Sequence, residues 1–350
     1  MVDPHKSESS PQERSLISFA LLAYKQEQYI REAVEGAFSQ TYSPLEIILS
    51  DDCSPDRTFD IIQEMAAKYT GPHKVVLNRN PQNFGIGAHV NRIMELTHGE
   101  LIVAAAGDDV SLPNRCELIQ KRWTAASRPV AVIYSDVIQM TADGRYFEEN
   151  RRDPQESEAR TVIDGLKGYQ SPVIGCSECW HRELFLFFGA IAIDVMNEDD
   201  VIWFRAALLG KVLHVNELLV RHRLHGNNTG SWGMDTKLKV EEWLHSREEV
   251  YRRQIAVRQN FLTDLERLKN SGSLCRDLGE IKAFIEQDLN FNRSCYGLCR
   301  AKNVRKFKYV LSYLRNMTGM NDFKWLTYLM FPDFYLWIKK GRNPRRSSYE

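Results

Sequence analysis

The sequence predicts an α/β fold, in which a mostly parallel sheet is covered by helices on both faces and is followed by a helical C-terminal region. Two observations predict it. Between residues 16 and 136 short apolar runs alternate with longer amphipathic segments, and beyond residue 230 only helical periodicity remains. Strands that alternate with helices of this length are typical of parallel sheets, because each crossover needs a helix. We therefore expect one large α/β domain with a helical extension.

Five apolar runs have the length and composition of buried parallel strands. They are residues 16–23, 45–49, 75–77, 101–105 and 130–135. The segments between them have helical spacing; in residues 27–40, for example, Ile30, Val34 and Phe38 fall on one face. The other expected helices are residues 55–69, with Ser54 as the cap, residues 88–96, and residues 113–126, with Pro113 in the first turn.

Composition divides the chain into three parts. Residues 1–14 are polar and lack the apolar core of a secretory signal, so we expect a flexible tail. Residues 15–232 hold the alternating pattern and form the expected α/β domain. Residues 233–350 form the helical C-terminal region, which begins with a long amphipathic helix over residues 237–269.

The compartment follows from what the chain contains. No apolar stretch approaches the roughly 20 residues that span a bilayer as a helix, and 46 basic residues balance 46 acidic ones. We expect a cytoplasmic protein with reduced thiols. Its seven cysteines include one CxxC pair, Cys176 and Cys179, and no second such pair. A structural zinc site usually needs two pairs, so packing is favoured over metal binding or redox chemistry for these cysteines.

Polar side chains follow three of the expected strands directly. Tyr24 follows the first strand, Asp51 and Asp52 the second, and Asp108 and Asp109 the fourth. Because ligands of parallel sheets bind beyond the carboxyl ends of the strands, we expect these clusters to converge at one edge. Adjacent carboxylates can accept hydrogen bonds from a base or a ribose, or bind a divalent cation that holds phosphates. A turn rich in capping residues explains Asp51 and Asp52 equally well.

A third acidic cluster opens an apolar segment with helical character. It consists of Glu198, Asp199 and Asp200, directly before residues 201–209. Carboxylates at a helix N-terminus are favoured by the helix dipole, which would make the cluster structural. Alternatively, one carboxylate acts as a general base, which requires it to face the other clusters. Both interpretations stay open at this point.

Two further motifs contain residues that could bind phosphate. His222, Arg223 and His225 precede Gly226, and an imidazole beside a guanidinium suits a diphosphate or a metal bound to it. Surface histidines often have no such role. Residues 83–87, Asn-Phe-Gly-Ile-Gly, resemble a fragment of a dinucleotide fingerprint that lacks its third glycine. We expect these two glycines to permit a tight turn into the next helix.

Taken in chain order, these motifs resemble those of family 2 glycosyltransferases with the GT-A fold. The resemblance covers residues 15–232 and includes residues 18–25, 39–42, 46–58, 83–91, 98–113, 198–210 and 223–228. The chain departs from the family pattern at three positions. Lys25 stands where asparagine is common, Ala106 replaces the first aspartate of a four-residue acidic motif, and Cys53 replaces a glycine. We interpret Cys53 as indicating a less strained turn.

The resemblance implies an inverting glycosyltransferase of the bacterial surface-polysaccharide type (O-antigen or capsule) that uses Mg²⁺ or Mn²⁺. Asp199 would be the base that accepts the proton of the acceptor hydroxyl, with Asp200 as the alternative. Asp109 and Asp108 would bind the metal, with His225 as an added ligand. The residues implied in binding the nucleotide-sugar are Tyr24, Asp51, Asp52, Asn83, Asn91, Asp108 and Arg223.

The expected partners are a nucleotide-sugar donor and an acceptor hydroxyl on a lipid-linked glycan. A UDP-sugar is the first expectation for the donor, because UDP-sugars are common donors in this family. Two other functions fit parts of the pattern. A metal-dependent nucleotidyltransferase or sugar-nucleotide hydrolase would use Asp108 and Asp109 but would not need the 198–205 block, and a non-catalytic nucleotide-sugar-binding protein would need no base.

Basic and aromatic residues are concentrated between residues 293 and 346. Cations that flank aromatic and aliphatic side chains favour the interface of an anionic bilayer, which would place the protein on the inner face of the cell membrane. The alternative is that the aromatic side chains pack on the catalytic domain. Nucleic acid is not an expected partner, because the basic stretch contains no recognisable nucleic-acid module.

Overall fold

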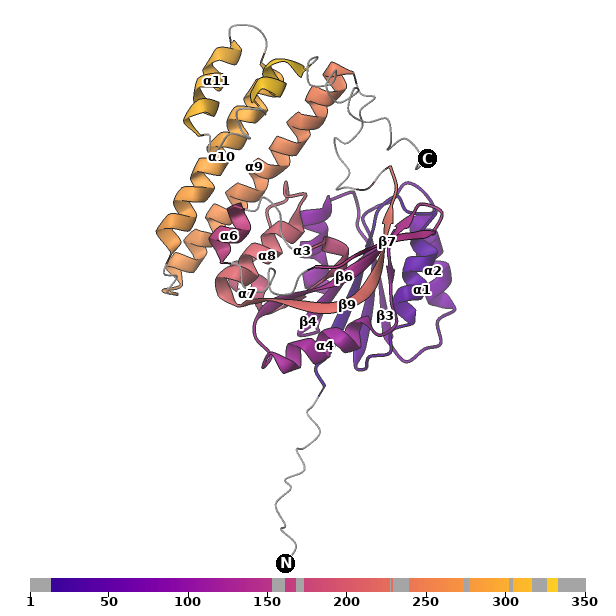
Figure 1. Cartoon of the computed structure of the whole chain (residues 1–350). Helices are drawn as coiled ribbons and strands as arrows, with labels where there is room; N and C mark the ends of the chain where they lie inside the picture. The colour runs from indigo at the N-terminus through magenta and orange to yellow at the C-terminus, as the bar shows by residue number, and fades with distance from the viewer. Residues whose placement is uncertain are drawn as a thin grey trace, which may run out of the picture.

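The computed structural model describes residues 14–152, 161–167, 173–226, 228, 239–273, 277–301, 305–316 and 326–332, without the side chains of residues 305–307. It contains an α/β body and a layer of long helices beside it (Figure 1). The expected N-terminal tail lies outside the described residues, apart from Arg14, and so does the C-terminal segment 333–350.

Within the described residues, nine strands form one sheet in the order β3-β2-β1-β4-β8-β6-β9-β5, and β7 pairs with β6. Six of the strands run in the same direction, and β5, β7 and β8 run antiparallel to their neighbours. The expected mostly parallel sheet is therefore confirmed. The strands are β1 Ile17–Ala23, β2 Leu45–Asp51, β3 Lys74–Arg79, β4 Leu101–Ala106, β5 Val110–Ser111, β6 Ala131–Thr141, β7 Tyr146–Asn150, β8 Glu178–His181 and β9 Lys211–Leu224.

Helices cover both faces of the sheet, as the sequence predicts (Figure 1). The alternation of side chains along β1 separates the two cores: Phe19 and Leu21 point to one face, Ala20 and Leu22 to the other. On the first face lie α1 Ile30–Phe38, α2 Thr58–Ala67 and α4 Arg115–Ala125. On the second lie α3 Ile86–Leu96, α6 Val162–Lys167, α7 Glu183–Phe188 and α8 Glu198–Leu209.

The five expected strands and the four expected helices of the first half all exist, with ends that differ by a few residues. One cap was wrongly assigned. Helix α2 begins at Thr58 with Arg57 as the N-cap, three residues later than Ser54. The Ser54 hydroxyl instead donates a hydrogen bond to Asp51, so this serine closes the turn after β2 rather than capping the helix. Strands β5, β7, β8 and β9 were not predicted. The first three are short, and the 14-residue β9 lies in a segment without clear alternation.

The helical C-terminal region consists of α9 Val240–Asn270, α10 Leu278–Arg300 and α11 Arg305–Arg315, among the described residues. Helices α9 and α10 lie side by side; α9 packs against α7 and α8, and α10 contacts α6 (Figure 1). A separate apolar cluster joins α9, α10 and α11 to residues 326–330, and within it Leu326 and Leu329 are buried. Part of the aromatic and aliphatic segment therefore packs on the helical layer. The rest, from residue 333 onward, lies outside the described residues.

A buried ion pair connects α8 to α9. The Arg205 guanidinium donates from Nε to Asp264 Oδ2 at 2.8 Å and from Nη2 to Oδ1 at 3.1 Å, and neither side chain is exposed. Arg205 Nη1 also donates to the Gly189 carbonyl at 2.8 Å, and Asn260 donates to Asp264 at 2.9 Å. Since the charges are paired in two parallel hydrogen bonds, the contact holds the helical layer in one register on α8.

We expect Asp264→Ala to lower the free energy of unfolding by about 3–5 kcal/mol, because it leaves the Arg205 charge buried without its partner. Urea denaturation followed by circular dichroism measures the change. Asp277→Ala is the matched control, since Asp277 is exposed at the start of α10 and makes no side-chain cap; it should change stability by less than about 0.5 kcal/mol. A similar small loss for both variants would show that the pair does not fasten the two parts together.

Candidate active site

The carboxyl ends of β1, β2, β3 and β4 meet at one edge of the sheet. Ala23 is in register with Asp51, and Leu22 with Ala106. Backbone hydrogen bonds continue this alignment beyond the strands: the Asp52 amide donates to the Ala23 carbonyl and the Gly107 amide to the Leu22 carbonyl, both at 2.9 Å. The expected convergence of the Tyr24, Asp51–Asp52 and Asp108–Asp109 clusters is therefore what the sheet register produces.

Asp51 is completely buried at the end of β2. Its carboxylate accepts hydrogen bonds from the backbone amide and the hydroxyl of Ser54, and Arg79 Nε lies 3.6 Å from Oδ2. Burial raises the pKa of Asp51, and the Ser54 hydrogen bonds and Arg79 oppose that rise. Tyr24, by contrast, is exposed at the end of β1, and the Lys25 ammonium lies 5.0 Å from the centre of its ring.

Asp52 has a different set of partners. Its Oδ1 accepts from the Asn80 side chain at 2.8 Å and from the Phe84 amide at 2.9 Å, and its Oδ2 accepts from the Gly85 amide at 2.9 Å. The carboxylate therefore holds the loop of residues 80–85 against the end of β2. Asn83, on the same loop, is exposed, and its side chain accepts a hydrogen bond from the Gly85 amide.

Two residues other than glycine adopt the left-handed backbone conformation at this edge. Lys25 has φ of 58° after β1, and Cys53 has φ of 60° after β2. The expectation of a less strained turn at Cys53 is therefore wrong, because the chain keeps a conformation that glycine adopts freely and that costs other residues about 1–2 kcal/mol. The family's asparagine at the position of Lys25 fits the same geometry, since asparagine is enriched in this region.

Asn91 lies on α3 and contacts the loop before α8. Its side chain donates to the Ile191 carbonyl and accepts from the Ile191 amide, both at 2.8 Å. Gly87, one turn earlier, brings α3 so close to this loop that a Cβ atom would lie 2.7 Å from the Val195 carbonyl oxygen. Gly85 has φ of 78° and supplies the expected tight turn. Gly87 instead permits close packing.

Asp108 and His225 form a pair at the end of the acidic motif. His225 Nε2 lies 2.9 Å from Asp108 Oδ2, and the two side chains are only 11% and 12% exposed. The Tyr29 ring stacks on the imidazole with ring centres 5.1 Å apart. The pair therefore brings together a carboxylate oxygen and a ring nitrogen from distant parts of the chain. Both side chains remain partly open to solvent. Both were predicted as metal ligands.

Arg223 is buried and fully engaged by the protein. Its guanidinium donates to the carbonyls of Asp108 and Ala142 at 3.0 Å and to Glu32 at 2.9 Å, and it lies 4.8 Å from the centre of the Tyr29 ring. The backbone amide of Arg223 donates to Asp109 Oδ1 at 2.7 Å. The residue expected to contact the nucleotide-sugar thus joins β9 to the loop between β4 and β5.

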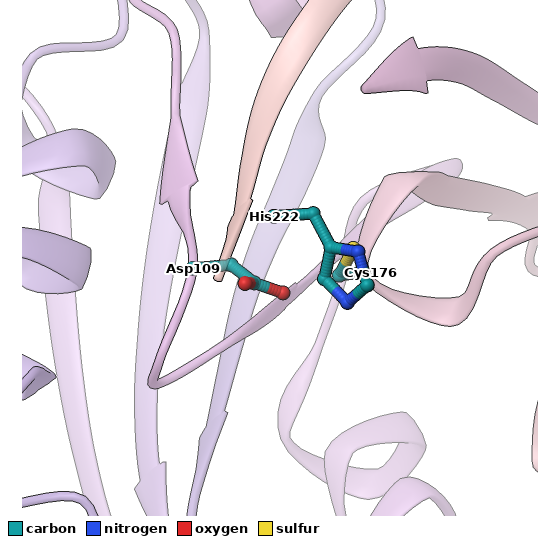
Figure 2. Close-up of side chains that lie close together, drawn as sticks. All are labelled: Asp109, Cys176 and His222. Carbon is teal, nitrogen blue, oxygen red and sulfur yellow. The ribbon is translucent and has the colours of Figure 1, made fainter. Parts of the chain in front are cut away.

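Asp109 lies near a short helical turn, η1 Gly175–Ser177, which carries Cys176. Its carboxylate lies close to the Cys176 sulfur and the His222 ring, with one ligand-type atom of each residue within 4.8 Å of the others (Figure 2). Burial, with the nearby charge of Asp108, raises the pKa of Asp109 to about 8. The sequence interpretation of Cys176 as a packing residue missed this group.

The acidic cluster at the start of α8 lies on the other side of η1. A Cβ atom added to Gly175 would lie 3.8 Å from Asp199 Oδ2 and 3.5 Å from Glu198 Oε1. Burial raises the pKa of Glu198 to about 7 and that of Asp199 well above its ordinary value, and the neighbouring carboxylates add to the rise in both. One three-residue turn thus lies near Asp109, through Cys176, and near Asp199, through Gly175.

Glu178 belongs to the same surroundings and was not predicted. It follows η1 at the start of β8, its side chain is almost completely buried, and its Oε2 has no hydrogen-bond partner among the described residues. Burial raises its pKa well above the ordinary value, and the charges of Asp199 and Glu198 add to the effect. A glutamate between two cysteines in an apolar block was the available signal, since a charge in such a segment is rarely buried without a role.

This combination of a mostly parallel sheet, acidic motifs at its carboxyl edge and a helical layer is the architecture of GT-A glycosyltransferases. The fold is similar to that of solved structures of TarS from S. aureus. One, of fragment 1–349, has a TM-score of 0.51 over 94% of this chain and 93% of that chain at 13% identity. Another, of the same fragment in complex with UDP-GlcNAc, has a TM-score of 0.50 over 86% and 90% at 12% identity.

Residues 18–181 match the family model of glycosyl transferase family 2, which, together with the GT-A-like fold, supports a family 2 glycosyltransferase. Similar proteins include an uncharacterised protein of Mycobacterium tuberculosis, 34% identical over 128 residues, 34% of this chain and 36% of the relative. Chondroitin synthase of Pasteurella multocida is 24% identical over 64% of this chain and 22% of the synthase. An uncharacterised glycosyltransferase of Rickettsia typhi is 24% identical over 93% of this chain and 97% of the relative. The chain thus spans about a third of the mycobacterial protein and less of the synthase.

We expect the free energy of unfolding, measured with a chelator present, to fall as the pH rises from about 6.5 to about 8.5. Unfolded carboxyl groups are ionised in this window, whereas the raised pKa values of Asp109, about 8, and Glu198, about 7, keep protons on the folded chain. Losing those protons removes up to about 1.4 kcal/mol per pH unit and group. His89 and His222 have lowered pKa values, so they are neutral in the folded chain, and their unfolded forms lose most of their charge by about pH 7.5; they oppose the trend only at the low end of the window.

Asp109→Asn should flatten this slope, and urea denaturation at a series of pH values measures it. Asp143→Asn is the control: the Asp143 carboxyl is exposed, and hydrogen bonds from Thr141 and Arg145 hold its pKa below the ordinary value, so it is ionised throughout the window. A stability that stays constant or increases over this range, or an unchanged slope in Asp109→Asn, would contradict the burial of protonated carboxyl groups at this edge.

Proposed function

We propose that the protein is an inverting glycosyltransferase that moves a sugar from a UDP-sugar to a hydroxyl group of a lipid-linked glycan. The observation that carries the proposal is the position of η1, which has Asp109 beside Cys176 and Asp199 beside Gly175. A diphosphate held near Asp108 and an acceptor held near Asp199 would therefore meet across a short distance. Sugar transfer with inversion requires these two groups on opposite sides of the reacting carbon.

Asp108 and His225 fit a divalent cation. Their ligand atoms lie 2.9 Å apart, close to the separation of about 2.9 Å between adjacent ligands of an octahedral ion with bonds of about 2.0–2.1 Å. Mg²⁺ or Mn²⁺ bound here would neutralise negative charge on the donor diphosphate. Asp109 would help to position this pair, because its hydrogen bond from the Arg223 amide fixes the start of the segment that carries His225.

Asp199 is the proposed base. It stands in the first turn of α8, where its Oδ1 accepts a hydrogen bond from the Asp200 amide at 3.0 Å, so the other oxygen can accept a proton from the acceptor hydroxyl. Desolvation raises the pKa of Asp199 well above its ordinary value, and a carboxylate with a raised pKa is a stronger proton acceptor. Asp200, the alternative, carries the amide that orients Asp199.

The donor nucleotide is proposed from the edge formed by β1, β2 and β3. Asp51 sits beyond β2, with the exposed Tyr24 ring beside it at the end of β1. An aromatic ring and a carboxylate there suit a base and a ribose. Asp52 and Asn83 would act by shaping the 80–85 loop around them, and Asn91 by positioning the loop before α8. TarS, which shares the fold, was solved in complex with UDP-GlcNAc, which supports a UDP-sugar as the first donor to test.

The hydrolase or nucleotidyltransferase alternative predicts donor consumption without an acceptor. That alternative assigns no role to the acidic cluster of α8, which lies near η1. Sugar transfer is the function that uses both the Asp108–His225 pair and this cluster. A non-catalytic binding protein would equally have no need for Asp199.

We also propose a peripheral association with anionic membranes through residues 333–350, which contain Lys339, Lys340, Arg342, Arg345 and Arg346. Among the described residues, no helix has both the length and the apolar character needed to cross a bilayer. The helical layer already buries Leu326 and Leu329, so the basic and aromatic residues beyond them are the part of the segment proposed to contact lipid.

Two variants separate binding from catalysis. Asp108→Asn should abolish the part of the UDP-GlcNAc-induced rise in melting temperature that depends on Mn²⁺, because a carboxylate ligand is lost. Asp199→Asn should keep that rise and slow transfer by about 10²–10⁴-fold, the usual contribution of a positioned base. Differential scanning fluorimetry with UDP-, GDP- and dTDP-sugars, with and without Mn²⁺, identifies the donor, since ligands that bind the folded state raise its melting temperature.

The rate of UDP release from the donor identified in this way, with and without a lipid-linked glycan extract, measures transfer. Asp194→Asn is the control, because Asp194 is exposed in the loop before α8 and should leave both properties unchanged. Full activity of Asp199→Asn and Asp200→Asn, or no response to any nucleotide-sugar by the unaltered chain, would overturn the proposed reaction.

Removal of residues 333–350 should abolish co-sedimentation with vesicles of phosphatidylglycerol and phosphatidylcholine. Binding of the full chain should be weaker with phosphatidylcholine alone and should decrease with added salt, because screening weakens the attraction between basic side chains and anionic lipid. The truncation keeps Leu326 and Leu329 and therefore the apolar cluster of the helical layer. If the shortened chain binds these vesicles as the full chain does, the segment is not the anchor.

A further inference from the structure

Three side chains with different ligand atoms meet behind the Asp108–His225 pair. Asp109 comes from the loop between β4 and β5, Cys176 from η1, and His222 from β9 (Figure 2). One oxygen, one sulfur and one nitrogen of these residues lie within 4.8 Å of one another. The carboxylate and the imidazole approach from neighbouring strands of the sheet, and the thiol approaches from outside it.

The hydrogen bonds of this group are incomplete. Asp109 Oδ1 accepts from the Arg223 amide, and the Cys176 sulfur lies within 4.8 Å of the same carboxylate. His222 Nδ1 is buried and has no hydrogen-bond partner among the described residues. A buried ring nitrogen without a partner costs free energy, and native proteins satisfy such atoms with a protein group, water or an ion. The ring nitrogen therefore points to a ligand that the three side chains share.

We propose that Asp109, Cys176 and His222 bind a divalent transition metal of the zinc class, at a site separate from the Asp108–His225 pair. A thiolate, an imidazole and a carboxylate are the usual ligands of Zn²⁺, and sulfur selects it over Mg²⁺ and Mn²⁺. On binding, the Cys176 thiol and the Asp109 carboxyl group each release a proton to solvent, and the sulfur and the carboxylate form bonds to the metal. With three protein ligands, a fourth position stays open for water.

The present spacing of the three ligand atoms allows them to bind zinc after a small adjustment. Tetrahedral zinc with bonds of about 2.0–2.3 Å requires its ligand atoms to lie about 3.3–3.5 Å apart, whereas these atoms lie within 4.8 Å. Asp109 and His222 are fixed by the sheet and by the Arg223 amide. Cys176 lies in a three-residue turn, so its side chain can make the approach.

A metal here would fasten η1 to the sheet. Because Gly175 of the same turn lies so near Asp199 and Glu198 that an added Cβ atom would touch them, the ion would set the distance between the two halves of the edge without touching a substrate. This inference concerns a binding site of the chain and does not rest on the proposed reaction.

Cobalt(II) tests the site without any enzymatic assay, because thiolate coordination to Co²⁺ produces a charge-transfer absorption band. The chain, stripped with a chelator and supplied with excess Mg²⁺, should develop this band with one equivalent of Co²⁺ and lose it when Zn²⁺ is added. Cys176→Ser should not show the band. His222→Gln should retain the thiolate but bind Co²⁺ on the order of 10–100-fold more weakly.

Two controls separate this site from its neighbours. Cys299→Ser removes a partly buried thiol of α10 and should leave the band unchanged. The double variant Asp108→Asn, His225→Gln should also retain it, which distinguishes the site from the proposed Mg²⁺ or Mn²⁺ pair. The proposal is overturned if the folded, unaltered chain shows no thiolate band, or if the band persists in Cys176→Ser.

Discussion

Buried carboxyl groups dominate the electrostatics at the carboxyl edge of the sheet. The fold has removed them from water without placing an equal number of cations beside them. Asp109, Glu178, Glu198 and Asp199 all have raised pKa values, and burial is the first cause in each. Raising the pKa of a carboxyl group by one disfavours its ionised form by about 1.4 kcal/mol. The folded chain therefore holds free energy that a cation, or a group that donates hydrogen bonds, recovers on binding. Such an arrangement is typical of a functional site rather than of a core.

Strand β9 is the element that makes this concentration of charge possible. It runs parallel to β6 over most of its length, with irregular register between Ser135 and Val137, and it pairs antiparallel with β5 near its end. Pairing with β5 places Arg221 opposite Val110, immediately after Asp109. The residues that follow on β9 therefore lie next to the acidic loop. One strand thus carries His222 of the proposed zinc site and Arg223, which joins β9 to the loop between β4 and β5. It ends directly before His225.

The sequence predicted the fold class and the convergence of the motifs because both follow from periodicity and from the rule for parallel strands. It did not separate residues that face a ligand from residues that hold the scaffold. Asp52, Asn91 and Arg223 belong to recognisable motifs, yet their side chains are engaged by the loop 80–85, by Ile191 and by Glu32. A motif records that a side chain is required at a position. Whether it contacts substrate depends on loops whose paths the sequence pattern does not determine.

The same reason explains why Cys176 and Glu178 were missed. Their neighbours in sequence are apolar residues and an isolated CxxC, which favour packing, and the residues they meet in space come from other elements of the chain. Cys53 illustrates the converse error, because the loss of a glycine was expected to change the backbone, and the backbone kept its left-handed conformation. The residue type at one position predicts the backbone conformation poorly where hydrogen bonds to other segments already fix the turn. The hydrogen bond from the Asp52 amide to the Ala23 carbonyl is an example.

The helical layer is more than an extension of the catalytic domain. The N-terminal turn of α8 carries Asp199, and the same helix carries Arg205, which is held by Asp264 of α9 with both side chains buried. Arg205 also binds the carbonyl of Gly189, in the loop that Asn91 holds from α3. The position of the proposed base therefore depends on contacts from α3 on one side and from α9 on the other. Because a base works only within hydrogen-bond reach of its proton, the long helices beyond residue 239 take part in defining the geometry of the edge.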